Sequence, residues 1–359
     1  MKAKKIIKWS LAVVGIIIIS LVGFGFWFIN LVKQNAAEKI DYSSITPQEL
    51  PYLSEDSVVH RGKILAVVTS TDMMGTSEKE TGFEFTELSR AYYVFIANGF
   101  DVDVASPKGG KAPVVMDDMG KYDYAFLNDD LAQSKIKNTI PMSRVNANEY
   151  EAIYFVGGKG AMFDFPQNTH IQSVVRNLYE SGKIVGAVCH GPAALTNVQL
   201  SSGDLLIKNK QVSGFTNAEE LLLISDAREI FPFLLQDKLS QNGARFSEGP
   251  KYLENVAIDG KIVTGQNPWS TWLVAESMIK QLGYQPKIRE VTDEENAEMV
   301  LRSYEHAGID SAIKTIVKMQ SKDLKINKAF LGGHTIIAIW QLQFGKAFDF
   351  IRLIKLLQN

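Results

Sequence analysis

The chain has 359 residues, of which 46% are hydrophobic and 22% charged, with a formal net charge of −2. This length accommodates one large domain with an appendage, or two domains. The near-neutral charge argues against a general nucleic-acid binder, because such proteins carry a basic surface. The single cysteine, Cys189, excludes an intramolecular disulfide bond and a metal site built from several cysteines.

The N-terminus predicts a membrane anchor. Four lysines precede an uncharged apolar run at residues 9–32, which is long enough to span a bilayer as a helix. A signal peptide has a shorter apolar core, so we expect a retained anchor, although Ala36-Ala37 would allow cleavage. The lysines place residues 1–8 in the cytoplasm and the main body outside it, attached by a single pass. The alternative interpretation is a buried core helix.

Strands and helices alternate through the middle of the chain, which is typical of a parallel sheet covered by helices on both faces. Apolar and alternating runs predict strands at residues 63–70, 100–106, 150–156 and 183–188. Helical spacing predicts helices at residues 85–98 and 170–182. Sites in such folds form at the carboxyl ends of strands, so the turns after Ser70, Val156 and Val188 are expected to converge.

Residues 111–148 interrupt this alternation, and a long insertion of this kind is often a cap over a site. The sequence then predicts a strand at 211–215, a helix at 227–242, a strand pair at 256–264 and a helix at 269–282. We therefore expect a linker at 33–60 after the anchor at 1–32, and a catalytic domain at 61–284.

Residues 285–359 form a predicted all-α extension. Helical spacing of apolar residues recurs in four segments, at 294–305, 311–319, 329–342 and 347–357. Gly308 and Gly345 each precede a helix and are 37 residues apart, a separation close to that of tetratricopeptide-type hairpins. A helical bundle packed on the main domain is an equally good interpretation.

The stretch Gly186–Leu195 resembles a nucleophile elbow. A buried strand ends at Val188, Cys189 and His190 follow, and a helix restarts at Gly191-Pro192. The free N–H groups of a helix start favour an anion, which here would be the cysteine thiolate. A buried apolar cysteine followed by a surface histidine would show the same spacing.

Six motifs in register resemble the ThiJ/PfpI superfamily, which shares the class I glutamine amidotransferase-like fold. They occur in the order TGFEFTEL (81–88), VASPKGG (104–110), GGKGAMFDF (157–165), AVCHGPAAL (187–195), GFTNAEE (214–220) and TGQNPWS (264–270). The branch they resemble is that of the glutathione-independent glyoxalases, or glyoxalase III, and related heat-inducible chaperones. The resemblance covers residues 62–283 and implies a flavodoxin-like α/β fold.

The resemblance also implies a set of site residues. The family uses an elbow cysteine, the following histidine and a carboxylate of the first helix, which match Cys189, His190 and Glu87. The glyoxalase branch adds a carboxylate that orients the histidine, here Glu220. Backbone N–H groups of Gly158 and His190 are expected to stabilise an oxyanion.

Two positions leave the choice of catalytic carboxylates open, and a third departs from the family pattern. Glu84 is a neighbouring carboxylate that resembles Glu87 in position, and Glu219 is the alternative to Glu220. The family usually has histidine where this chain has Lys159, so we expect Lys159 to affect substrate preference.

The implied reaction converts methylglyoxal or a related 2-oxoaldehyde to a 2-hydroxy acid through a cysteine hemithioacetal, with no metal and no cofactor. The resemblance also implies a homodimer. An extracytoplasmic placement is unusual for an enzyme that clears a cytosolic metabolite, and fits a protective or repair role at the envelope as well.

Other functions remain as alternatives. A glutamine amidotransferase needs an H-x-E motif, and none of the five histidines begins one (His60, His170, His190, His306 and His334). A cysteine peptidase would use Cys189, His190 and Glu220. A membrane-tethered holdase would bind a protein partner through the C-terminal helices, and an oxidation sensor would use the Cys189 thiol.

Overall fold

The computed structural model describes residues 15, 19–20, 22–33, 41–54 and 58–358. The described chain divides into two units. One spans residues 41–290, and the other joins the described N-terminal residues up to position 33 to the segment from 291 onward.

The larger unit is built on a seven-stranded sheet with strand order β10-β11-β7-β6-β1-β3-β5. Its strands are β1 (Lys63–Val67), β3 (Asp101–Ser106), β5 (Ile140–Pro141), β6 (Ala152–Phe155), β7 (Ile184–Val188), β10 (Val256–Asp259) and β11 (Ile262–Gly265). Neighbouring strands are parallel except β10 and β11, which are antiparallel. Val67 is aligned with Phe155, and Phe155 with Ala187, so β1, β6 and β7 end at the same edge.

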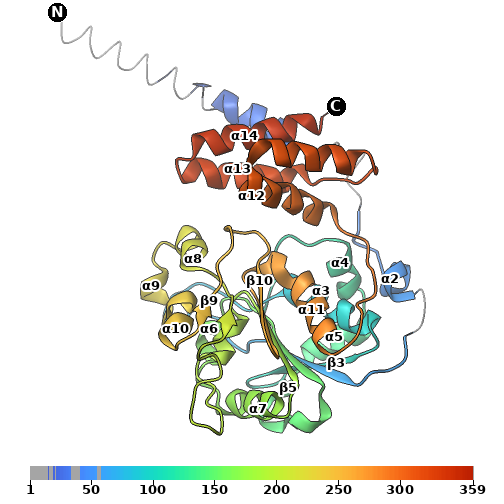
Figure 1. The fold of residues 1–359 in the computed structure, drawn as a ribbon, viewed down its shortest axis with the longest axis vertical. Helices are drawn as coiled ribbons and strands as arrows, with labels where there is room; N and C mark the ends of the chain where they lie inside the picture. The colour runs from blue at the N-terminus through green and yellow to red at the C-terminus, as the bar shows by residue number, and fades with distance from the viewer. Residues whose placement is uncertain (1–14, 16–18, 21, 34–40, 55–57, 359) are drawn as a thin grey trace, which may run out of the picture. The chain divides into compact units, whose positions relative to one another are not determined.

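Helices cover both faces of this sheet, as Figure 1 shows. The helices of the unit are α3 (Phe85–Ala97), α4 (Lys121–Leu127), α5 (Asp130–Lys137), α6 (Ala161–Asp164), α7 (Thr169–Glu180), α8 (Asn217–Leu223), α9 (Ala227–Ile230), α10 (Leu235–Gln241) and α11 (Thr271–Gln281), with a short α2 (Pro51–Ser54) before the first strand. Every residue of β6 and β7 is buried, because a central parallel strand has a helix layer on each side. The predicted α/β fold with a parallel sheet is confirmed.

Part of the segment at residues 111–148 packs into the main layers, and its role as a cap over the site stays a prediction. Its strand β5 pairs with β3 at the edge of the large sheet. The Phe126 ring of α4 is fully buried and packs edge-on against Tyr92 of α3, with the ring centres 5.1 Å apart. Polar residues interrupt the segment and concealed this packing from a reading of the sequence.

Two predicted elements after the elbow are shorter than expected. The predicted strand at 211–215 is reduced to β8 (Gln211–Val212), which pairs with β9 (Arg245–Phe246) in a separate small sheet. The predicted helix at 227–242 is divided into α9 and α10 around Pro232, whose ring does not fit a helix interior. Another small sheet joins β2 (Phe83–Glu84) to β4 (Val114–Val115).

The smaller unit is helical and contains α12 (Asp293–Gln320), α13 (Lys328–Trp340), α14 (Phe344–Leu356) and helical residues 22–32. Helix α12 bends at Ala307 and Gly308, where Gly308 has φ +74°. The Tyr304 hydroxyl donates to Asp349 Oδ2 at 2.8 Å and so ties α12 to α14. The tetratricopeptide-like pairing of these helices stays a prediction.

The predicted transmembrane anchor, with the membrane localisation inferred from it, is wrong. Within the described residues, no helix combines the length and the apolar character needed to cross a membrane. Residues 1–14, 16–18 and 21, part of the predicted anchor segment, lie outside the described residues.

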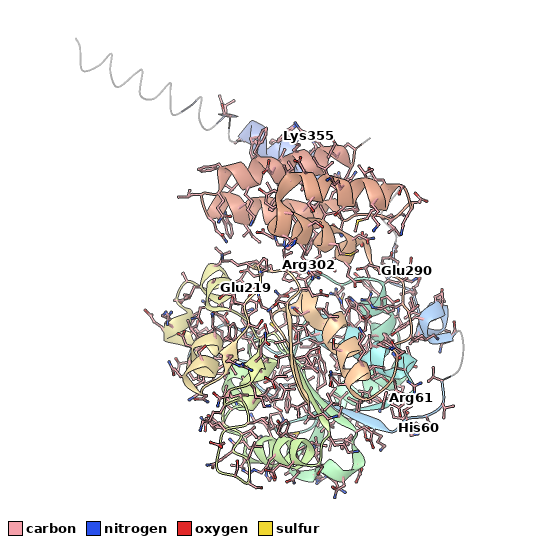
Figure 2. All side chains as sticks on the ribbon, in the orientation of Figure 1. His60, Arg61, Glu219, Glu290, Arg302 and Lys355 are labelled. Atoms are coloured by element: carbon pink, nitrogen blue, oxygen red, sulfur yellow. The ribbon has the colours of Figure 1, made fainter. Side chains whose placement is uncertain are left out.

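Two described apolar residues of this segment pack within the helical unit, whereas Ile19, Val22, Phe24, Phe26 and Ile29 are exposed. Phe28 and Leu31 are buried, and Lys355, labelled in Figure 2, places its Nζ 5.2 Å from the centre of the Trp27 ring. The predicted extracytoplasmic placement of the catalytic domain depended on the same anchor and is also wrong.

Candidate active site

Cys189 lies between the end of β7 and a 3₁₀ helix at Gly191–Leu195, in a left-handed conformation with φ +57°. This conformation is strained for a residue with a side chain and persists only where the surroundings hold it. The Cys189 N–H donates to the Gly265 carbonyl at 3.0 Å, and its carbonyl accepts the Phe215 N–H at 2.9 Å. The two hydrogen bonds hold the thiol at the carboxyl edge of the sheet.

The Cys189 side chain begins a chain of contacts through His190 to Glu220. Sγ lies 3.3 Å from His190 Nδ1, and His190 Nε2 lies 2.6 Å from Glu220 Oε2. All three side chains are buried. Because the Glu220 carboxylate accepts a hydrogen bond from Nε2–H, the proton of the neutral ring stays on Nε2, and Nδ1 is free to accept the thiol proton. This arrangement has the logic of a nucleophile, base and orienting carboxylate.

Glu219, the alternative partner for His190, is held by other groups. Its Oε2 accepts the N–H and hydroxyl of Thr216, which closes the first turn of α8 as a capping box. Its Oε1 accepts from the Tyr252 N–H at 2.7 Å and from the side chains of Gln266 and Asn267. The neighbouring carboxylates therefore have different partners: Glu220 contacts the histidine, and Glu219 accepts from backbone and side-chain donors elsewhere in the domain.

Glu87 approaches the cysteine from α3. Its Oε2 accepts the Gly157 N–H at 2.6 Å, and a Cβ at Gly157 would stand 2.6 Å from that oxygen and 2.9 Å from Cys189 Cβ. Only glycine fits between the two side chains. Oε1 of Glu87 is buried and receives no N–H or O–H hydrogen bond from the described residues. Tyr154 donates its hydroxyl to the Glu87 carbonyl at 2.9 Å and supports this turn of α3.

Burial determines the protonation of this group of side chains. Burial raises the pKa of Glu87 well above its usual range, and the nearby Glu84 carboxylate raises it further. Burial also raises the pKa of the Cys189 thiol. A neutral Glu87 donates a hydrogen bond to a thiolate instead of repelling it, so the proton on Glu87 favours ionisation of the cysteine.

Gly158 and Lys159 follow Gly157 in the turn after β6. Gly158 has φ +91°, and a Cβ there would stand 2.4 Å from the Gly82 carbonyl oxygen. Within the described chain, the N–H groups of Gly158 and His190 have no protein acceptor. Such free donors beside a nucleophile suit an oxyanion.

The structure also reveals neighbours of His190 that the sequence did not indicate. The ring centre of Phe215 lies 4.7 Å from that of the imidazole, and the ring centre of Phe231 lies at 6.2 Å. Phe215 belongs to the GFTNAEE motif, which was a usable signal, whereas nothing in the sequence marked Phe231. As for metals, the described side chains contain no cluster of three or more His, Cys, Asp or Glu groups arranged to hold an ion.

The sequence of this chain aligns with most of the length of its curated relatives. "Glutathione-independent glyoxalase hsp3102" of Schizosaccharomyces pombe is 32% identical over 216 residues, which span 57% of this chain and 90% of the relative. "Glyoxalase 3" of Candida albicans is 29% identical over 226 residues, 60% of this chain and 96% of the relative.

Solved structures of similar proteins also match this chain. The Rapid Encystment Protein 24 KDa of Francisella tularensis matches with a TM-score of 0.59 and 37% identity, over 62% of this chain and 99% of that chain. Glyoxalase III from Candida albicans matches with a TM-score of 0.56 and 28% identity, over 62% and 98%. The DJ-1/PfpI family model matches residues 79–281, more than half of the sequence, and the chain belongs to that family.

Proposed function

We propose that this protein is a glutathione-independent glyoxalase that converts methylglyoxal or a related 2-oxoaldehyde to the 2-hydroxy acid. The observation that carries the proposal is the buried contact chain from Cys189 through His190 to Glu220, with Glu87 beside the same sulfur. The relatives named glutathione-independent glyoxalases support the reaction class.

In the first step, His190 Nδ1 takes the thiol proton and the Cys189 thiolate adds to the aldehyde carbon. The oxygen that becomes negative is held by the N–H groups of Gly158 and His190 and then receives the proton from His190. The product is a hemithioacetal, with no change in oxidation state elsewhere.

In the second step, a proton moves between the two adjacent carbons. His190 removes the proton from the former aldehyde carbon, while neutral Glu87 protonates the oxygen of the neighbouring ketone. The resulting enediol takes the proton from His190 at the second carbon, and its first hydroxyl returns a proton to Glu87. The first carbon is thereby oxidised to a thioester and the second reduced to an alcohol, so no external oxidant or reductant is needed.

In the third step, water attacks the thioester and gives up a proton to His190. The Cys189 thiolate leaves, regains a proton, and the 2-hydroxy acid is released. The overall reaction consumes one 2-oxoaldehyde and one water.

The test is D-lactate formation from methylglyoxal without glutathione. We expect Cys189→Ser and Glu87→Gln to lower kcat/KM by at least about 100-fold, because each removes a group that handles charge or protons in the transition state. Glu78→Gln, at an exposed carboxylate of the loop before α3, is the matched control and should keep wild-type activity. Absence of turnover by a folded wild-type protein would refute the proposal.

Two association predictions accompany this function. The homodimer implied by the family resemblance is tested by light scattering on the purified chain, where a monomer mass would contradict it. A protein partner at the C-terminal helices is a separate prediction and plays no part in the proposed reaction.

A further inference from the structure

Lys159 is a cation at the active site without a matching anion. It follows Gly158 in the turn after β6, and Gly157 of the same turn lies against Glu87 and Cys189. The side chain is partly buried. Within the described part of the chain, its ammonium has no carboxylate within ion-pairing distance.

The charge of Lys159 nevertheless acts on two groups. Burial raises the pKa of the Glu84 carboxyl and of the Cys189 thiol, and the Lys159 ammonium offsets part of each rise. Glu84 lies beside the same turn, because its N–H donates to the Gly157 carbonyl at 3.2 Å. Lys159 is therefore close enough to influence the nucleophile.

The other acidic groups of the site do not neutralise Lys159. Glu220 is engaged by His190, and Glu219 by the capping box and the Tyr252 N–H. Glu87 is kept neutral by burial. Burial, opposed by Lys159, brings the pKa of Glu84 to about 7, so this carboxyl is only partly ionised at neutral pH.

We propose that Lys159 makes this site select 2-oxoaldehydes whose carbon chain carries an anionic group such as a carboxylate. The ammonium binds that group while the aldehyde end reaches Cys189. A strongly hydrated charge that is already partly desolvated gains most from a ligand of opposite charge. The inference rests on the proposed glyoxalase reaction, and the anionic group takes no part in the bond changes.

The test compares 4,5-dioxopentanoate with its uncharged methyl ester as substrates of the full chain. We expect the wild type to prefer the carboxylate in kcat/KM. Lys159→Gln should reduce that preference about tenfold, the scale of one charge-assisted hydrogen bond at a partly exposed site. Lys159→Arg should retain most of it.

Lys108→Gln is the matched control, because Lys108 is an exposed lysine just after β3 at the same edge of the sheet. It should leave the preference between the two substrates unchanged. An equal loss in Lys108→Gln would show general attraction of anions by the surface and overturn the role of Lys159.

A second readout uses Glu84, whose negative charge, once it ionises, opposes the binding of an anionic substrate near Lys159. The groups that influence Glu84 are Asp117, Lys159, Thr86, Arg90, Glu87 and Cys189. As pH rises through about 7, Glu84 ionises and the preference for the carboxylate substrate should fall. Glu84→Gln should flatten this dependence, and an unchanged slope in that variant would contradict the inference.

The outcomes separate the two proposals. If a folded wild type turns over neither substrate, the glyoxalase function fails. If it turns over both with a preference that Lys159→Gln does not alter, the function stands and the inference about Lys159 fails.

Discussion

At the scale of single residues, neighbouring carboxylates have different roles because their hydrogen-bond partners differ. Glu220 and Glu219 are adjacent in the sequence, yet one faces His190 and the other accepts five hydrogen bonds from the surrounding domain. Glu84 and Glu87 differ in burial, since Glu87 is fully buried and Glu84 is partly exposed. Substitutions at these pairs should therefore separate activity from stability.

Glu220→Gln and Glu219→Gln form the first such pair. Loss of the Glu220 charge should lower kcat roughly 100-fold with little change in unfolding free energy, because His190 loses the group that holds its tautomer. Glu219→Gln should cost about 1–3 kcal/mol of stability, because buried donors lose their acceptor. Steady-state kinetics and urea unfolding measure the two effects. An equal loss of kcat in both variants would contradict the assignment of Glu220 to His190.

Glu84→Gln should reveal a pH-dependent stability. The folded-state pKa of Glu84 is raised from 4.5 to about 7, so between these values the folded protein binds a proton that the unfolded chain has released. Wild-type stability therefore falls as pH rises through this window, and the variant lacks that loss. We expect the variant to gain about 3 kcal/mol in unfolding free energy relative to the wild type between pH 4.5 and 8, measured by urea unfolding. A pH-independent difference would contradict the raised pKa.

At the scale of elements, the site depends on how closely two strand ends approach. The turn after β6 and the elbow after β7 touch at Gly157, whose missing side chain leaves room for Glu87 Oε2 and Cys189 Cβ. Register brings these ends together, since Phe155 is aligned with Ala187. The catalytic geometry is thus a property of strand pairing as much as of the individual side chains.

Gly157→Ala tests this close approach. The added methyl would stand 2.6 Å from Glu87 Oε2 and 2.8 Å from the Val188 carbonyl oxygen, so the two strand ends must separate. We expect a loss of about 1–3 kcal/mol in unfolding free energy and at least about 100-fold in kcat/KM. Retention of both values near the wild type would show that the site tolerates a wider gap than the geometry implies.

At the scale of the whole molecule, the described helical residues 22–32 belong to the same unit as the C-terminal helices. Gly332 of α13 allows a close approach, because a Cβ there would stand 2.6 Å from Val32 Cγ1. Its neighbour Gly333 has nothing within 4 Å of such a Cβ. A side chain would therefore clash with Val32 at Gly332 but has free space at Gly333.

Gly332→Ala and Gly333→Ala should change stability in opposite directions. Alanine in a helix interior is favoured over glycine by about 1 kcal/mol, so Gly333→Ala should raise the melting temperature of the helical unit. Gly332→Ala should lower it, because Val32 must move. Calorimetry of the full chain, with lactate formation as the activity control, measures both. A stabilising Gly332→Ala would contradict the packing of residues 22–32 on α13.

Much of this protein follows from local patterns in its sequence. Strand and helix periodicity located the parallel sheet, because buried strands need continuous apolar runs, and local motifs marked Cys189, His190 and Glu87. The remaining features depend on three-dimensional packing. It paired His190 with Glu220 and surrounded Glu219 with backbone and side-chain donors. It also placed Phe231 beside the imidazole and buried Phe28 and Leu31 within the helical unit. Periodicity reports how apolar a segment is, but which surface covers it depends on contacts between residues far apart in the chain.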